Sequence, residues 1–204
     1  MKVITTLALI SSLLTTASAF VGPNRSCQSR KNLVFAETAA LEAILSSNYP
    51  TFYDILKRNE DLWKKLKDPS VQSYTVFCPS ESAMRNLGDK KMVQLKDDRN
   101  YETTSKIGLF HVINEAVSAD KLFDSAGVIS MAGDVVPVER SVSGGFMGLG
   151  GKEDGGTTVG GAKVTKTIQV DGDNSGGLIH EVDDLVSPNI LWRYMDQLRI
   201  PGSM

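Results

Sequence analysis

Two apolar, β-rich runs that lie far apart in the chain constrain its fold more than any other feature. The first, residues 74–78, ends at Pro79, and Ser80 can then cap a helix by accepting hydrogen bonds from its first free amides. The second, residues 177–186, ends at Ser187 and Pro188. These runs predict a strand that leads directly into a helix, and a last strand a domain length further on.

Helical patterns precede the first run. Residues 38–45 are rich in Ala and Leu, and Tyr49-Pro50 breaks that pattern. From Thr51 apolar residues recur at helical spacing and basic residues occupy the other face, which is typical of a solvated face. The apolar residues are Phe52, Ile55, Leu56, Leu62, Trp63 and Leu66, and the basic ones are Lys57, Arg58, Lys64, Lys65 and Lys67.

Further short elements are predicted between the two runs. Residues 107–113 form an apolar, strand-like run around one histidine, and Ser118 precedes a short capped helix. Residues 128–138 predict two strands hinged at Gly133, and residues 161–170 predict another strand.

The order of these pieces resembles the fasciclin-like domain. Residues 75–84 (Thr-Val-Phe-Cys-Pro-Ser-Glu-Ser-Ala-Met) resemble its first signature box, and residues 177–183 (Gly-Leu-Ile-His-Glu-Val-Asp) resemble its second. Phe110-His111-Val112-Ile113, Lys121-Leu122 and Gly160-Gly161-Ala162-Lys163-Val164 fall between them in family order. The resemblance covers roughly residues 38 to 188, and two boxes are much more specific than one. The structural motif residues carried over are Thr75, Phe77, Pro79, His111, His180 and Asp183.

The resemblance implies a single α+β domain over residues 36–188, in which a β-wedge of about seven strands packs with several helices. It also implies an adhesion or binding module without a catalytic centre. Two positions depart from the family pattern. Cys78 stands where Ala is common, and Phe110 stands where animal adhesion members have Tyr, so a contact through a phenol hydroxyl is not carried over.

The N-terminus has the features of a targeting sequence. After Lys2, an apolar stretch closes at Ala17-Ser18-Ala19, which predicts a secretory signal peptide over residues 1–19. Phe20 and a segment without acidic residues follow, which resembles the two-part plastid presequence of diatom-type algae and predicts a transit peptide over residues 20–35. The alternative is a plain secretory signal followed by a basic N-terminus.

Charge separates this N-terminus from the rest of the chain. Four of the 22 basic residues and none of the 24 acidic residues lie in residues 1–35, so residues 36–204 hold 18 basic and 24 acidic side chains, a formal charge of −6. This acidic balance argues against a nucleic-acid binder. A 41% hydrophobic share and 23% charged residues exclude global disorder. No transmembrane helix is expected in the mature chain.

The residue types argue against catalysis, a bound cofactor and a metal site. His111 and His180 are the only histidines, both lie in apolar runs, and each is expected to be packed and hydrogen-bonded to backbone. Cys78 would be the only cysteine left after processing, which is a poor supply of zinc ligands. The chain has no P-loop.

One loop resembles the opening of a calcium loop. Asp171, Asp173 and Ser175 supply oxygens at alternate positions, but Val182 stands where a calcium loop has Glu. A tight β-hairpin turn explains the same residues, so these three are weak calcium candidates.

Two segments are candidates for contacting a partner. Residues 143–161 predict a Gly-rich loop insertion, and Phe146, Met147 and Leu149 are apolar in a segment too rich in Gly to bury them reliably. Residues 189–204 predict a C-terminal helical extension that Ser187 caps. Its apolar stripe, which either packs back on the domain or docks on a larger complex, is Leu191, Tyr194, Met195 and Leu198.

We therefore predict a non-enzymatic protein-interaction module in a plastid, in the stroma or at the thylakoid surface, with the lumen left open. Its expected partner is a membrane-protein complex such as a photosystem. The alternatives are a secreted cell-surface or matrix adhesion protein and, from another class, a small-molecule carrier. The oligomeric state stays open.

Overall fold

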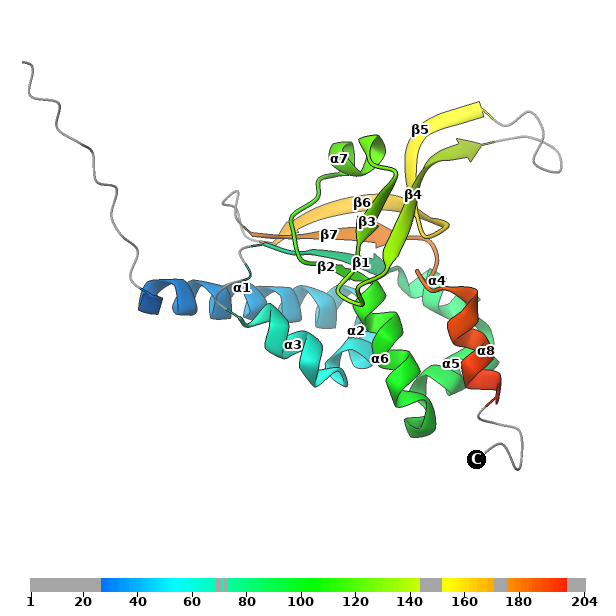
Figure 1. Ribbon diagram of the computed structural model, residues 1–204, viewed down its shortest axis with the longest axis horizontal. Coiled ribbons are helices and arrows are strands. Elements are labelled where there is room, and N and C mark those ends of the chain that lie inside the picture. Colours follow the sequence, from blue (N-terminus) through cyan, green and yellow to red (C-terminus); the bar gives the residue numbers. More distant parts are fainter. Residues whose placement is uncertain (1–26, 69–70, 72, 144–151, 171–175, 198–204) are drawn as a thin grey trace, which may run out of the picture.

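Figure 1 shows an α+β domain in which most helices lie on one side of a seven-stranded sheet and α7 lies on the other. The computed structural model describes residues 27–68, 71, 73–143, 152–170 and 176–197. The helices are α1 (Cys27–Asn48), α2 (Pro50–Lys57), α3 (Glu60–Leu66), α4 (Glu81–Asn86), α5 (Gly88–Lys96), the 3₁₀ turn η1 (Asp98–Asn100), α6 (Tyr101–Phe110), α7 (Ala119–Asp124) and α8 (Asn189–Gln197). The predicted fold class, including the C-terminal helix, is confirmed.

The seven strands form one sheet in the order β2-β1-β7-β6-β5-β4-β3. They are β1 (Thr75–Pro79), β2 (Val112–Ile113), β3 (Gly127–Ile129), β4 (Val135–Ser143), β5 (Lys152–Val159), β6 (Ala162–Val170) and β7 (Gly177–Val182). The pair β1–β7 is parallel, and the other neighbours are antiparallel.

The two β-rich runs of the sequence are the parallel neighbours β1 and β7. Phe77 lies opposite His180, and Pro79 lies opposite Val182. Both strands are almost entirely buried, as expected of a parallel pair covered on both faces. The chain then turns into α4, whose first turn is capped by the Ser80 hydroxyl, which accepts from the amide of Ala83 at 3.1 Å.

The two end strands of the sheet meet, so the sheet is nearly closed. Ile113 of β2 forms an isolated bridge with Ser130, and the amide of Met131 donates to the carbonyl of Val112 at 2.7 Å. The pairing between β5 and β6 is much shorter than the β4–β5 and β6–β7 pairings on either side of it. Only two residue pairs, Thr158↔Lys163 and Val159↔Ala162, connect β5 to β6. Beyond this joint the hairpin of β4 and β5 diverges from β6 (Figure 1).

Glycines allow close packing at two places in the core. A Cβ on Gly108 of α6 would lie 3.2 Å from a methyl carbon of Leu56 of α2, so the absence of a side chain lets these helices approach. A Cβ on Gly177 of β7 would lie 2.1 Å from the ring of Tyr74, which precedes β1. All six apolar residues predicted to face inward from the segment after Thr51 are buried.

Two expectations for local structure were wrong in part, and a third was confirmed. Residues 107–110 belong to α6 and only Val112–Ile113 is a strand, because a short apolar run has no periodicity that separates helix from strand. The helical pattern of residues 38–45 is confirmed, and it is part of a longer helix, α1, which begins at Cys27. The loop expected over residues 143–161 is shorter, because β5 occupies Lys152–Val159 with Gly155 at a positive φ of 75°.

Candidate interaction surfaces

His111 links the end of α6 to the segment before α8. Its Nδ1–H donates to the carbonyl of Ile107 at 2.7 Å, and its Nε2 accepts from the amide of Val186 at 3.0 Å. The ring is fully buried and lies 4.9 Å from the ring of Phe52. Burial lowers the pKa of His111 to about 4, so the imidazole is neutral and both nitrogens are used in structural hydrogen bonds.

His180 links β7 to the residue before the cap of α7. Its Nε2–H donates to the carbonyl of Val117 at 2.8 Å, and its Nδ1 accepts from the hydroxyl of Thr167 at 2.8 Å. Its ring stacks on Phe77 with centroids 5.8 Å apart, and burial lowers its pKa. The two histidines therefore use opposite tautomers to join separate segments.

The other motif residues also hold segments together. The hydroxyl of Thr75 donates to the carbonyl of Glu115 at 2.7 Å and accepts from the amide of Val117 at 2.9 Å. Asp183 accepts from the amide of Lys163 at 2.7 Å, and its own amide donates to the Lys163 carbonyl at 3.1 Å. The signature boxes of this chain thus form the scaffold of the fold.

Cys78 is buried, and it lies opposite the acidic residue Glu181 in the β1–β7 pair. Burial, and then the charge of Glu181, raise the pKa of its thiol, which disfavours the nucleophilic thiolate. The hydroxyl of Tyr49 donates to Glu181 at 2.8 Å, and its pKa is likewise raised by burial. This cluster ties α1 and α2 to the sheet.

The described residues hold no group of three His, Cys, Asp or Glu side chains placed to bind a metal ion. The weak calcium candidates Asp171, Asp173 and Ser175 lie outside the described residues. Three surface grooves have volumes of about 540, 590 and 520 Å³, and neither histidine lines any of them.

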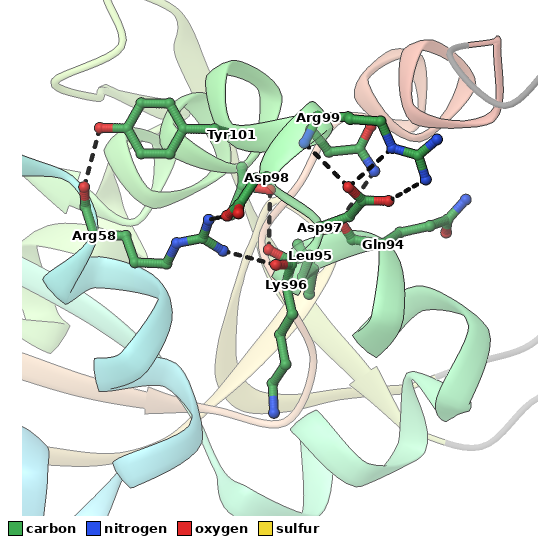
Figure 2. Close-up of polar contacts among 10 residues, drawn as sticks. Arg58, Gln94, Leu95, Lys96, Asp97, Asp98, Arg99 and Tyr101 are labelled. Atoms are coloured by element: carbon green, nitrogen blue, oxygen red, sulfur yellow. Dashed lines mark hydrogen bonds and ion pairs between the residues drawn. The ribbon is translucent and has the colours of Figure 1, made fainter.

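One residue of the basic face after Thr51, Arg58, bonds to another part of the domain instead of facing only solvent. The guanidinium of Arg58 donates to the carbonyl of Lys96 at 3.0 Å and pairs with Asp98, and the Tyr101 hydroxyl donates to the Arg58 carbonyl at 3.0 Å (Figure 2). Asp97 accepts from Arg99 in the same region. These contacts join α2 to the turn between α5 and α6, which the sequence pattern did not reveal.

The predicted apolar stripe of the C-terminal helix divides into two parts. Leu191 and Met195 are buried against the domain, so they are not available to a partner. Tyr194 is 52% exposed, and Leu198 lies outside the described residues. The expected cap differs too: helix α8 begins at Asn189, and the hydroxyl of Ser187 accepts from the indole N–H of Trp192 at 2.8 Å.

Helices α5 and α8 together expose apolar side chains that sequence reasoning missed. Val93 of α5 is 58% exposed and Ile190 of α8 is 48% exposed. The two helices are neighbours, because the ammonium of Lys91 lies 4.9 Å from the ring of Trp192. We call Val93, Ile190 and Tyr194 the α5–α8 surface. The other predicted contact residues, Phe146, Met147 and Leu149, lie outside the described residues.

Comparison with known families decides what kind of domain carries these surfaces. The fasciclin domain matches residues 47–188, which is most of the chain. The chain belongs to the fasciclin domain family. Fasciclin domains are adhesion and protein-interaction modules and are typically non-enzymatic. The family match ends immediately before α8, so the exposed residues of α8 lie beyond the matched part of the domain.

Among solved structures, a FAS1 domain pair from the insect cell adhesion molecule fasciclin I is similar, with 20% sequence identity and a TM-score of 0.44. The match covers 68% of this chain and 45% of that chain, so this chain spans less than half the length of the domain pair. No curated protein gives a significant match. In the described part of this fasciclin-domain chain, every helix is too short or too polar to cross a membrane.

Proposed function

We propose that this fasciclin-domain protein is a non-enzymatic interaction module that is delivered to a plastid and docks on a membrane-protein complex, for instance a photosystem. The observation that carries the docking is the pair of exposed side chains Ile190 and Tyr194, which lie one turn apart on α8 within the α5–α8 surface. Helix α8 packs on the domain through Leu191 and Met195 and leaves Ile190 and Tyr194 in solvent. Tyrosine is one of the residues enriched at protein interfaces.

Two further features support this proposal. The Ala17-Ser18-Ala19 site followed by Phe20 favours delivery to a plastid of the diatom type, in the stroma or at the thylakoid surface, with the lumen open. The formal charge of −6 on residues 36–204 favours a basic partner surface over an anionic lipid surface. Phe146, Met147 and Leu149 of the Gly-rich segment are proposed as a second contact.

The location is tested with a fluorescent fusion of residues 1–40 expressed in a diatom. We expect the wild-type fusion to enter the plastid and Phe20→Ala to be diverted to secretion. A conservative Phe20→Trp variant is the matched control and should still enter the plastid. Secretion of the wild-type fusion would overturn the plastid location and favour a secreted cell-surface or matrix adhesion protein, which the Ala17-Ser18-Ala19 site alone also supports.

The docking surface is tested by placing a photo-crosslinking residue at position 194 in the full chain. We expect cross-links to a membrane-protein complex from position 194. The matched control places the same photo-crosslinking residue at Ile129, which is 67% exposed but belongs to β3 rather than to α5 or α8. Position 129 should give no cross-links. A protein that stays wholly soluble and uncross-linked in plastid fractions would contradict the proposal.

A further inference from the structure

A groove of about 540 Å³ lies where β5 diverges from β6, with α7 as its third wall. Helix α7 contributes Phe123 and two carboxylates, β5 contributes Gly155 and Gly156, and β6 contributes residues 164–167. This groove is separate from the α5–α8 surface, because no residue of those two helices lines it.

One wall of the groove is a strand edge. On one side β6 pairs with β7 from Val164 to Val170, with a register shift between Val164 and Lys166. On its other side β6 pairs with β5 only at Ala162 and Lys163, so no strand in the described part of the chain covers that edge over residues 164–170. A strand edge without a neighbour presents main-chain donors and acceptors that can pair with another chain.

The wall formed by β5 leaves room for a main chain. A Cβ on Gly155 would meet nothing within 4 Å, so the open space lies at Gly155, whereas a Cβ on Gly156 would lie 3.1–3.2 Å from atoms of Asp154, Lys163 and Ser141. The strand register shifts between Arg140 and Val142 of the partner strand, so β5 bulges at these glycines. Bulges of this kind bend a strand and end its pairing, which keeps the groove open.

Two of the three charged side chains that line the groove are carboxylates, and the guanidinium of Arg140 lies 4.7 Å from the ring of Phe123 in its α7 wall. Asp120 and Asp124 are exposed, lie one turn apart on α7, and both line the groove. Lys166 lines the wall formed by β6. Lys163 is not available to neutralise the α7 carboxylates, because its ammonium hydrogen-bonds to Asp154 and lowers the pKa of Asp154 to about 2. Among the described residues, Asp120, Asp124 and Lys166 have no ion-pair partner.

We propose that this groove binds an extended peptide segment of a partner protein, which adds as a strand to the free edge of β6 and places basic side chains against Asp120 and Asp124. Main-chain pairing gives such a site its affinity and the side-chain contacts give its specificity. The segment would be about five or six residues long, the usual length of a strand. The inference goes beyond the proposed docking of the α5–α8 surface and does not depend on the plastid location.

The test uses the full chain and a fluorescent hexapeptide of alternating Lys and Val, with a Glu-Val hexapeptide as the acidic comparison. We expect the basic peptide to bind with an affinity that falls as salt is raised, and the acidic peptide not to bind. The Asp120→Asn and Asp124→Asn double variant should bind the basic peptide about tenfold more weakly. The matched control is Asp54→Asn with Asp89→Asn, which removes two exposed acids from α2 and α5 and should leave binding unchanged.

Two measurements separate strand addition from charge attraction alone. Two isomers of the basic peptide are N-methylated either on the Lys residues or on the Val residues. They should bind with different affinities, because the Lys and Val amides of an extended peptide point to opposite edges and only one edge of the added strand faces β6. Hydrogen exchange should show new protection of amides within residues 164–170 when the peptide binds. Equal binding of both isomers, or protection confined to another region, would overturn the proposal. A dimer of the chain that protects the same amides without peptide would overturn it in favour of a second copy as the occupant.

Discussion

The buried imidazole of His111 makes stability depend on pH. Its pKa is lowered to about 4 in the folded protein, whereas an unfolded chain has the ordinary value of about 6.5. Between these values the unfolded state binds more protons, so the free energy of unfolding falls as the pH is lowered. The stabilisation from keeping this ring neutral is present above the unfolded pKa and is lost as the pH falls toward the folded pKa.

We expect the free energy of unfolding to drop by about 2 kcal/mol more between pH 7 and pH 5 in the wild type than in His111→Gln. Urea unfolding of both proteins at the two pH values measures this difference. The variant keeps the contribution of His180, whose pKa is also lowered by burial, so some slope remains. Identical slopes in the two proteins would show that His111 is not held neutral.

Gly177 is required by the ring of Tyr74. A Cβ at this position would lie 2.1 Å from that ring, and the strands cannot separate easily because the amide of Leu178 donates to the Tyr74 carbonyl at 2.8 Å. We expect Gly177→Ala to lower the free energy of unfolding by about 1 to 3 kcal/mol, as overpacking does. The double variant with Tyr74→Leu should lose less than the sum of the two single variants, because the clash is then removed. Additive losses would contradict the contact.

Local signals made some elements predictable. Ser80 and Ser118 cap helices as expected, with the Ser118 hydroxyl accepting from Lys121 at 3.4 Å, because a cap depends on residues within one turn. Strand β5 was hidden because Gly155 and Gly156 interrupt any alternation of polar and apolar residues. The apolar stripe predicted one face of α8 but not which of its residues are buried. Met195 is buried and Tyr194 is exposed only because of how α8 contacts the domain, which the sequence pattern does not show.

The two halves of that stripe should respond differently to mutation. Met195 is fully buried, so Met195→Ala should lower the free energy of unfolding by about 2 to 4 kcal/mol. Tyr194→Ala changes an exposed side chain and should stay within about 0.5 kcal/mol of the wild type. Thermal or urea unfolding measures both, and a photo-crosslinking residue at the exposed position 190 shows whether Tyr194→Ala loses partner contact. A large loss of stability in Tyr194→Ala would mean that this residue belongs to the core.

Contacts between distant segments were only partly predictable. The two signature boxes indicated the fold class through their family resemblance, yet neither box shows that β1 and β7 are parallel neighbours. The β5–β6 divergence and the groove beside α7 depend on how far each strand stays paired, which a sequence pattern does not encode. Candidate surfaces that depend on a single helix were therefore easier to predict than the groove, which needs three elements.

Because neighbouring strands of the sheet are paired over different lengths, we expect different parts of the molecule to differ in local stability. Six residue pairs connect β6 to β7, whereas two connect β5 to β6. The hairpin of β4 and β5 therefore depends mainly on its own pairing, on β3 and on α7, while β1 and β7 lie in the centre of the core. We expect native-state hydrogen exchange to show lower opening free energies for amides within Lys152–Val159 than for those of Phe77 and Ile179. If all these amides exchange with the same opening free energy, the short β5–β6 pairing is as strong as the longer β6–β7 pairing. In that case β5 does not open independently of the core.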